Sequence, residues 1–218
     1  MKFQNNTLKR RSFFQKSLAI GALSLNTQLW ANESTFAAPR SLFMIGPLEG
    51  YSPQIGTLVS MLNYNRDTVI KSVKDLTTEQ IDFLLDDKAN TVAALVMHLG
   101  AVEKFYQINT FEGRQEFNKE EKQLWDSAMN LGDEGRKNIK GKEVKYYLDL
   151  LAEVRQKTLQ LLKTKDDKWL MAVDPEWSKE QDLNTYWKWF HVCEHESNHR
   201  GQIAFLRGRI PGLKAGKE

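Results

Sequence analysis

Residues 182–212, DLNTYWKWFHVCEHESNHRGQIAFLRGRIPG, decide the fold because they form one long helical pattern that also carries metal-ligating side chains. Apolar residues recur along this stretch at helical spacing, and the Pro-Gly pair at 211–212 is expected to end the helix. His191, His195 and His199 repeat every four residues, which places them in a stripe along one side. The stretch therefore predicts a helix whose imidazoles can share a metal ion.

Within this helix, residues 195–199 read HESNH and match the H-E-x-x-H pattern of zinc proteases. In those enzymes two histidines hold the zinc, the glutamate is the base, and a third ligand follows downstream. After His199, however, no His, Asp or Glu follows until Glu218, the last residue. A zinc protease is therefore the disfavoured alternative, and a third ligand must come from an earlier segment.

Helical periodicity also dominates the rest of the chain, and strand signals are absent. Ser52 is expected to cap the first long helix, and Thr77 with Gln80 forms a capping-box pattern at a short second one. Four long helices predict an all-α four-helix bundle, in which the long polar segment 113–142 makes a crossover between the second and third long helices. The expected helices cover residues 52–76, 77–85, 90–111, about 119–130, 143–163 and 182–212.

His98 lies on the apolar face of the helix expected over 90–111. A lone histidine there is more often a core residue, but a metal shared with two histidines of the last helix would satisfy three buried imidazoles at once. Spacing does not choose between the His191/His195 pair and the His195/His199 pair. Three imidazoles with one open position are the arrangement of a catalytic zinc.

Two residues of the last helix are candidates for a catalytic group. Gln202 lies one turn beyond His199, and Glu196 corresponds to the base of H-E-x-x-H, although it points about 100° away from the histidine stripe. Glu103 and Glu194 lie off the ligand faces and are expected to be solvated or to support the ligands.

Two classes of function follow from such a site. A metal-dependent hydrolase or small-group transferase would need an open coordination position facing a pocket, which residues such as Phe105 and Tyr106 are expected to line. The alternative is a non-catalytic binding or structural module that the metal stabilises. The small-molecule substrate of the enzyme is unknown.

The N-terminus resembles a twin-arginine export signal, with Arg10 and Arg11 followed by an apolar run over 18–25 that is too short to span a bilayer. We therefore expect an exported, periplasmic or extracytoplasmic protein without a stable membrane anchor after cleavage. The expected organisation is an export signal and linker at 1–38, an extended linker at 39–51, the bundle at 52–212 and a tail at 213–218.

The charge balance depends on this signal. The chain has 31 Lys and Arg against 28 Asp and Glu, and residues 1–31 contain five of the basic residues and no acidic one. Removing those five leaves 26 basic residues against 28 acidic ones. A nucleic-acid partner is therefore not expected, because such proteins need cationic surface. The single cysteine, Cys193, excludes an internal disulfide and is expected to be buried.

The phrases NTVAALVMHLGAVEKFY, at 90–106, and HVCEHESNHRGQIAFLRGRIPG, at 191–212, resemble the DinB-like (YfiT/DinB) superfamily of metal-dependent proteins. This resemblance implies an up-down-down-up bundle, a divalent metal (zinc or nickel) and, in many members, a homodimer. It assigns His98, His195 and His199 as ligands and leaves His191 outside. Some relatives hydrolyse substrates or transfer small thiols such as bacillithiol, so the family does not give one reaction. The export signal departs from the usual cytosolic members.

Overall fold

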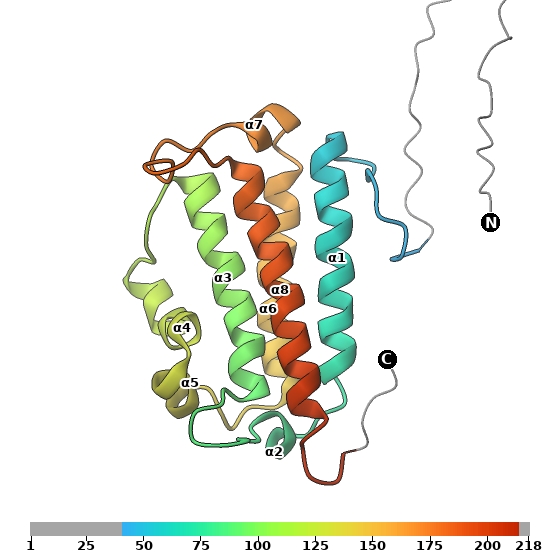
Figure 1. The fold of residues 1–218 in the computed structure, drawn as a ribbon, viewed down its shortest axis with the longest axis vertical. Coiled ribbons are helices and arrows are strands. Elements are labelled where there is room, and N and C mark those ends of the chain that lie inside the picture. The colour runs from blue at the N-terminus through green and yellow to red at the C-terminus, as the bar shows by residue number, and fades with distance from the viewer. Residues whose placement is uncertain (1–40, 214–218) are drawn as a thin grey trace, which may run out of the picture. The chain divides into compact units, whose positions relative to one another are not determined.

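Four long helices form the bundle: α1 (Pro53–Val73), α3 (Val92–Glu112), α6 (Val144–Leu162) and α8 (Thr185–Arg207), shown in Figure 1. The computed structural model describes residues 41–213, so the predicted export signal lies outside the described residues. Between residues 41 and 213 there is no strand, only an isolated bridge between Val173 and Asn184. No helix in this range combines the length and the apolar character needed to cross a bilayer. The predicted all-α class is confirmed.

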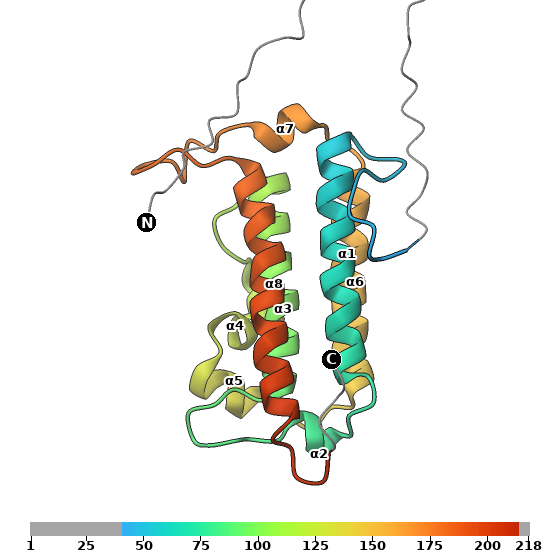
Figure 2. The same cartoon turned by 45° about the vertical axis from the view of Figure 1, so that its right-hand side comes forward.

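The course of the chain matches the predicted up-down-down-up order. Helices α1 and α8 run in one direction, and α3 and α6 run in the other (Figures 1 and 2). The crossover from α3 to α6 contains α4 (Lys119–Asn130) and α5 (Gly132–Asn138), and α4 packs against α3. The helix expected at about 119–130 is therefore present, and the crossover brings it beside the helix that carries His98.

Helix ends differ from the predictions where distant residues take part. Helix α2 (Thr78–Ile81) has the predicted capping box but stops well before residue 85. Ser52 makes no side-chain cap bond to α1; instead, the Asp167 carboxylate of α7 (Asp167–Met171) accepts hydrogen bonds from the backbone N–H groups of Gln54 and Ile55. Helix α8 begins after an Asn184 cap and ends at Arg207, before the proline. The cap of α1 thus comes from a residue that lies 113 positions after Gln54 in the sequence.

The apolar core forms two clusters along the bundle axis, and a charged layer lies where they meet. In α1, Leu62 belongs to one cluster and Val69 to the other, with Arg66 between them. In α6, Arg155 lies between Val154 of one cluster and Leu162 of the other. The corresponding positions in α3 and α8 are buried glutamates, Glu103 and Glu196.

These four residues form a closed ion network that contacts every long helix. The carboxylate of Glu103 accepts hydrogen bonds from Arg66 Nη2 and from Arg155 Nε, both at 2.8 Å. The carboxylate of Glu196 accepts from Arg66 Nε at 2.5 Å and from Arg155 Nη2 at 2.9 Å. The remaining guanidinium Nη1 groups donate to backbone carbonyls of α1 and α6. Burial alone would raise the pKa of Glu103, but Arg155 and Arg66 outweigh it and lower that pKa to about 2. Both carboxylates therefore have their charge compensated inside the bundle.

Removing one charge from this network should be costly. In Glu103→Gln the shape is kept, but two buried guanidiniums share one carboxylate, so we expect a loss of about 3–5 kcal/mol in the free energy of unfolding. Urea denaturation of the metal-free protein measures this loss. Glu153→Gln, at an exposed position of α6, is the matched control and should change stability by less than about 0.5 kcal/mol. Equal effects of the two substitutions would contradict the role of the network.

Candidate metal centre

Helix α3 supplies the first imidazole from inside the bundle. Thr91 caps the helix by accepting from the Ala94 backbone N–H, and His98 follows on the buried face with 8% of its surface exposed. Nδ1 of His98 lies 2.8 Å from the carbonyl oxygen of Ala128, at the end of α4. Because a carbonyl can only accept, Nδ1 carries the proton and Nε2 keeps a free lone pair. The crossover segment thus orients the ring of His98.

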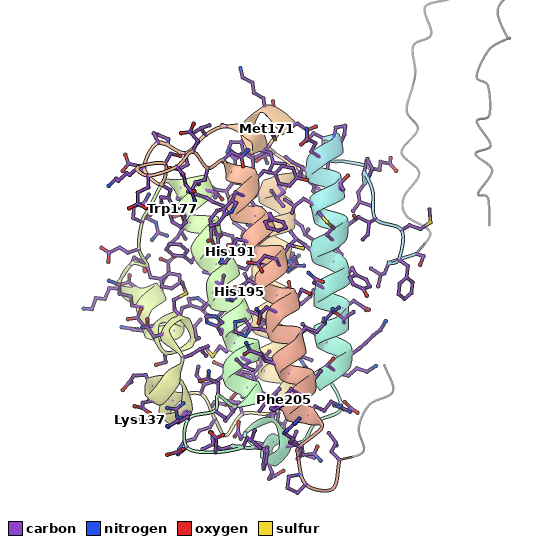
Figure 3. The ribbon with its side chains drawn as sticks, in the orientation of Figure 1. Lys137, Met171, Trp177, His191, His195 and Phe205 are labelled. Carbon is purple, nitrogen blue, oxygen red and sulfur yellow. The ribbon has the colours of Figure 1, made fainter. Side chains whose placement is uncertain are left out.

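Helix α8 supplies two more imidazoles, from the partly buried His195 and His199. Nδ1 of His199 lies 3.1 Å from Oε1 of Gln202, and Nε2 of Gln202 donates to Oδ1 of Asn198. The amide oxygen accepts the Nδ1 proton, so Nε2 of His199 is also left as a lone pair. Figure 3 shows His191 and His195 one above the other on α8, facing α3. Gln202 therefore supports a histidine rather than acting as a free group.

The three rings converge on one point. Nε2 of His195 lies 3.2 Å from Nε2 of His98 and 3.1 Å from Nε2 of His199, and one ring nitrogen of each residue lies within 4.8 Å of the others. Tetrahedral ligands with bonds of about 2.0–2.1 Å to zinc would lie about 3.3 Å apart. A single proton on Nε2 of His195 could form a hydrogen bond to only one of the two neighbouring Nε2 atoms, whereas a cation could be bound by the lone pairs of all three. The residues therefore fit a divalent metal.

The electrostatics of the triad also suit a metal. Burial lowers the pKa of His98 to about 4, with a smaller contribution from His199. Burial, together with the neighbouring histidines, lowers the pKa of His195 to about 3, and burial also lowers the pKa of His199. Metal ligation requires neutral imidazole. At neutral pH a metal would therefore not have to displace protons from these rings.

His191 lies next on the stripe but has other partners. Its Nδ1 is 2.8 Å from Oε1 of Glu194, and its ring stacks on Trp187 with a centroid distance of 5.5 Å. Among the residues that the structure describes, the cluster that could hold a metal consists of His98, His195 and His199. The structure thus brings together the pair that the resemblance assigned.

The structure corrects the expectations for the acidic residues. Glu196 is 2% exposed and both of its carboxylate oxygens bind arginines, so it is not a free base and the H-E-x-x-H protease mechanism does not apply. Glu103 is fully buried in the same network rather than solvated. Sequence reasoning missed the network, although Arg66 and Arg155 lie on the apolar stripes of their helices and were a visible signal.

The aromatic residues expected beside the metal lie in a packed cluster. Phe105 and Tyr106 contact Trp177, with ring centroids 6.2 and 6.0 Å away, and Tyr106 also contacts His191. Tyr106 is buried and Phe105 partly buried. These rings therefore pack together on the side of the triad where His191 lies.

We expect the purified chain to bind about one divalent ion, and His195→Ala to bind less than a tenth as much, because the central ligand is removed. His191→Ala is the matched control from the same stripe and should keep the metal. Elemental analysis after exhaustive dialysis makes the comparison. Equal metal content in the two variants would contradict the assignment of the site.

The lowered pKa values predict how acid affects the metal-free protein. The pKa of His98 is about 4 when folded against 6.5 in its unperturbed state, so the unfolded chain binds the proton first as pH falls. The stability held above pH 6.5 should therefore decline between about pH 6.5 and pH 4. Urea unfolding at several pH values should show a smaller decline for His98→Gln. Identical pH profiles for both proteins would refute this explanation.

Comparison with known proteins agrees with this fold. The sequence profile described as mycothiol-S-transferase matches residues 57–212. No curated protein matches the chain. A crystal structure described as a conserved protein from Enterococcus faecalis has the same fold, with a TM-score of 0.56 and 17% identity, over 71% of this chain and 95% of that one. The profile covers most of the chain and confirms the DinB-like resemblance: the chain belongs to the mycothiol-S-transferase family.

Proposed function

We propose that this protein is a divalent-metal-dependent enzyme that transfers a small thiol to an organic electrophile. The observation that carries the proposal is the convergence of three imidazole Nε2 atoms in a chain of a thiol-transferase family. The reaction forms a bond between the thiol sulfur and a carbon atom and breaks the bond between that carbon and a leaving group. The leaving group departs with the electron pair, and the thiol proton is released.

Each site residue has a role in this proposal. His98, His195 and His199 would hold the ion, which when bound supplies a Lewis acid that lowers the pKa of a thiol or of water. The Ala128 carbonyl and the Gln202 amide fix the two outer imidazoles in the tautomer that presents Nε2. Nitrogen ligands in this number suit zinc, and nickel is the second choice.

The glutamates near the triad are already bound to other side chains, which favours thiol transfer over hydrolysis. Hydrolysis of an ester or amide needs a group that moves protons to and from the reacting atoms. Glu196 and Glu103 are both bound to arginines, and Glu194 binds His191. A thiol that ionises near neutral pH needs no such base, so the proposal does not depend on one. A non-catalytic metal-stabilised module is the outcome if no turnover is found.

The proposal also covers which class of thiol the enzyme uses and where the enzyme acts. The family name specifies mycothiol for its members. For this chain we propose a small thiol as a class, because we also propose export through the twin-arginine signal at Arg10 and Arg11. An exported enzyme would need a thiol that is present outside the cytoplasm.

Turnover with the metal removed and restored tests the proposal. Chlorodinitrobenzene with cysteine, glutathione or mycothiol reports thiol transfer, and nitrophenyl acetate reports hydrolysis. We expect thiol transfer that is lost with phenanthroline, returns with zinc or nickel, and falls at least roughly 100-fold in kcat/KM in His195→Ala but not in His191→Ala. Transfer that survives chelation, or hydrolysis as the only activity, would overturn the proposal.

A further inference from the structure

A groove of about 700 Å³ lies beside the metal centre, between the C-terminal half of α8 and the segment that precedes α3. Figure 3 shows Phe205 on α8, beyond His195 toward the C-terminal end of the helix. Phe205 is 50% exposed and Leu85 is 36% exposed, so large apolar side chains face this space uncovered. Its lining comprises Leu85, Asp86, Lys88, Ala89, Asn90 and Leu95 on one side and Asn198, Gly201, Gln202, Phe205 and Leu206 on the other.

None of the three histidines lines the groove, but residues close to two of them do, one on each helix. Gln202 lines the groove and also accepts the hydrogen bond from Nδ1 of His199. On α3, Leu95 lines the groove three residues before His98, one helical turn away. A molecule in the groove would therefore lie within one turn of two of the three proposed ligands.

Gly201 is a glycine that packing within the chain does not explain. It lies inside α8, where glycine costs about 1 kcal/mol relative to alanine. At Gly56 and Gly100 a Cβ atom would press on Leu48 and Trp125, at 2.4 and 3.1 Å, so close packing requires those glycines. At Gly201 a Cβ atom would meet nothing within 4 Å. The space above Gly201 belongs to the groove, and a ligand that approaches the helix backbone closely would account for the glycine.

The chemistry of the lining indicates the kind of ligand. Leu85 and Phe205 offer exposed apolar contact, and the amides of Asn198 and Gln202 lie at the end nearest His199. The ligand therefore has an apolar body and a polar group that can accept a hydrogen bond. A hydrophilic thiol of the sugar type would leave the apolar lining unused, whereas an organic electrophile fits it.

We infer that this groove binds the apolar body of the electrophile, with its polar, reacting end toward the triad and Gly201 providing the space. That the ligand is an electrophile rests on the proposed thiol transfer, but binding in the groove can be tested without turnover.

Binding of the neutral fluorescent probe N-phenylnaphthylamine to the zinc-loaded full-length protein tests the groove. Gly201→Trp fills the open space and should weaken binding at least about tenfold, and Gly201→Ala, whose added methyl group enters the space where the ligand approaches the backbone, should weaken it by a smaller factor of about threefold. Phe205→Ala should weaken binding several-fold, and Phe190→Ala, at an equally exposed position of α8 outside the groove, should not. Zinc content and thermal melting confirm that each variant is folded and loaded.

The outcomes separate this inference from the proposed function. Absence of probe binding, or equal binding by wild type and Gly201→Trp, would overturn the inference that the groove binds an apolar ligand. If binding follows the expected pattern and thiol transfer occurs, KM for chlorodinitrobenzene should rise in Gly201→Trp while KM for the thiol stays unchanged. A rise in KM for the thiol instead would assign the groove to the thiol and overturn the inference. If binding follows the pattern but no thiol is transferred, the groove stands and the thiol-transfer proposal fails.

Discussion

The buried ion network is the constraint on which the rest of the structure depends. The helices that carry the histidines each contribute one glutamate, Glu103 from α3 and Glu196 from α8, and both glutamates bind the same two arginines from α1 and α6. A buried ion pair adds little net stability over apolar packing, but a missing partner is costly. The network therefore favours one register of the four helices. In that register His98 faces His195 and His199, which no contact local to either helix could ensure.

Bringing three imidazole lone pairs together is unfavourable in free energy, and a bound cation would offset that cost. Two of the three Nε2 lone pairs are set by protons on Nδ1, and they face His195 at little more than 3 Å. Burial keeps the rings neutral rather than letting them repel as cations. The arrangement is thus preorganised for a metal, and the groove that we infer to bind an apolar ligand lies beside it.

Much of this structure could be predicted from the sequence, because the signals are local. Helical periodicity gave the four long helices, the length of the polar segment gave the crossover, and the four-residue spacing put His195 and His199 on one face. The pairing of Arg66 with Glu103 and Glu196 could not be predicted, because an arginine in an apolar stripe does not identify its partner. The cap of α1 by Asp167 was missed for the same reason, since 113 residues separate donor and acceptor. The role of Glu196 could not be predicted either, because the H-E-x-x-H pattern says nothing of arginines on other helices.

X-ray absorption spectroscopy at the zinc edge of the zinc-loaded protein tests the central claim most directly. The account predicts three imidazole nitrogens at about 2.0–2.1 Å and one further light ligand, with no sulfur from the protein. A shell with two imidazoles or fewer, or a protein sulfur at about 2.3 Å that only Cys193 or a methionine could supply, would contradict the three-histidine site.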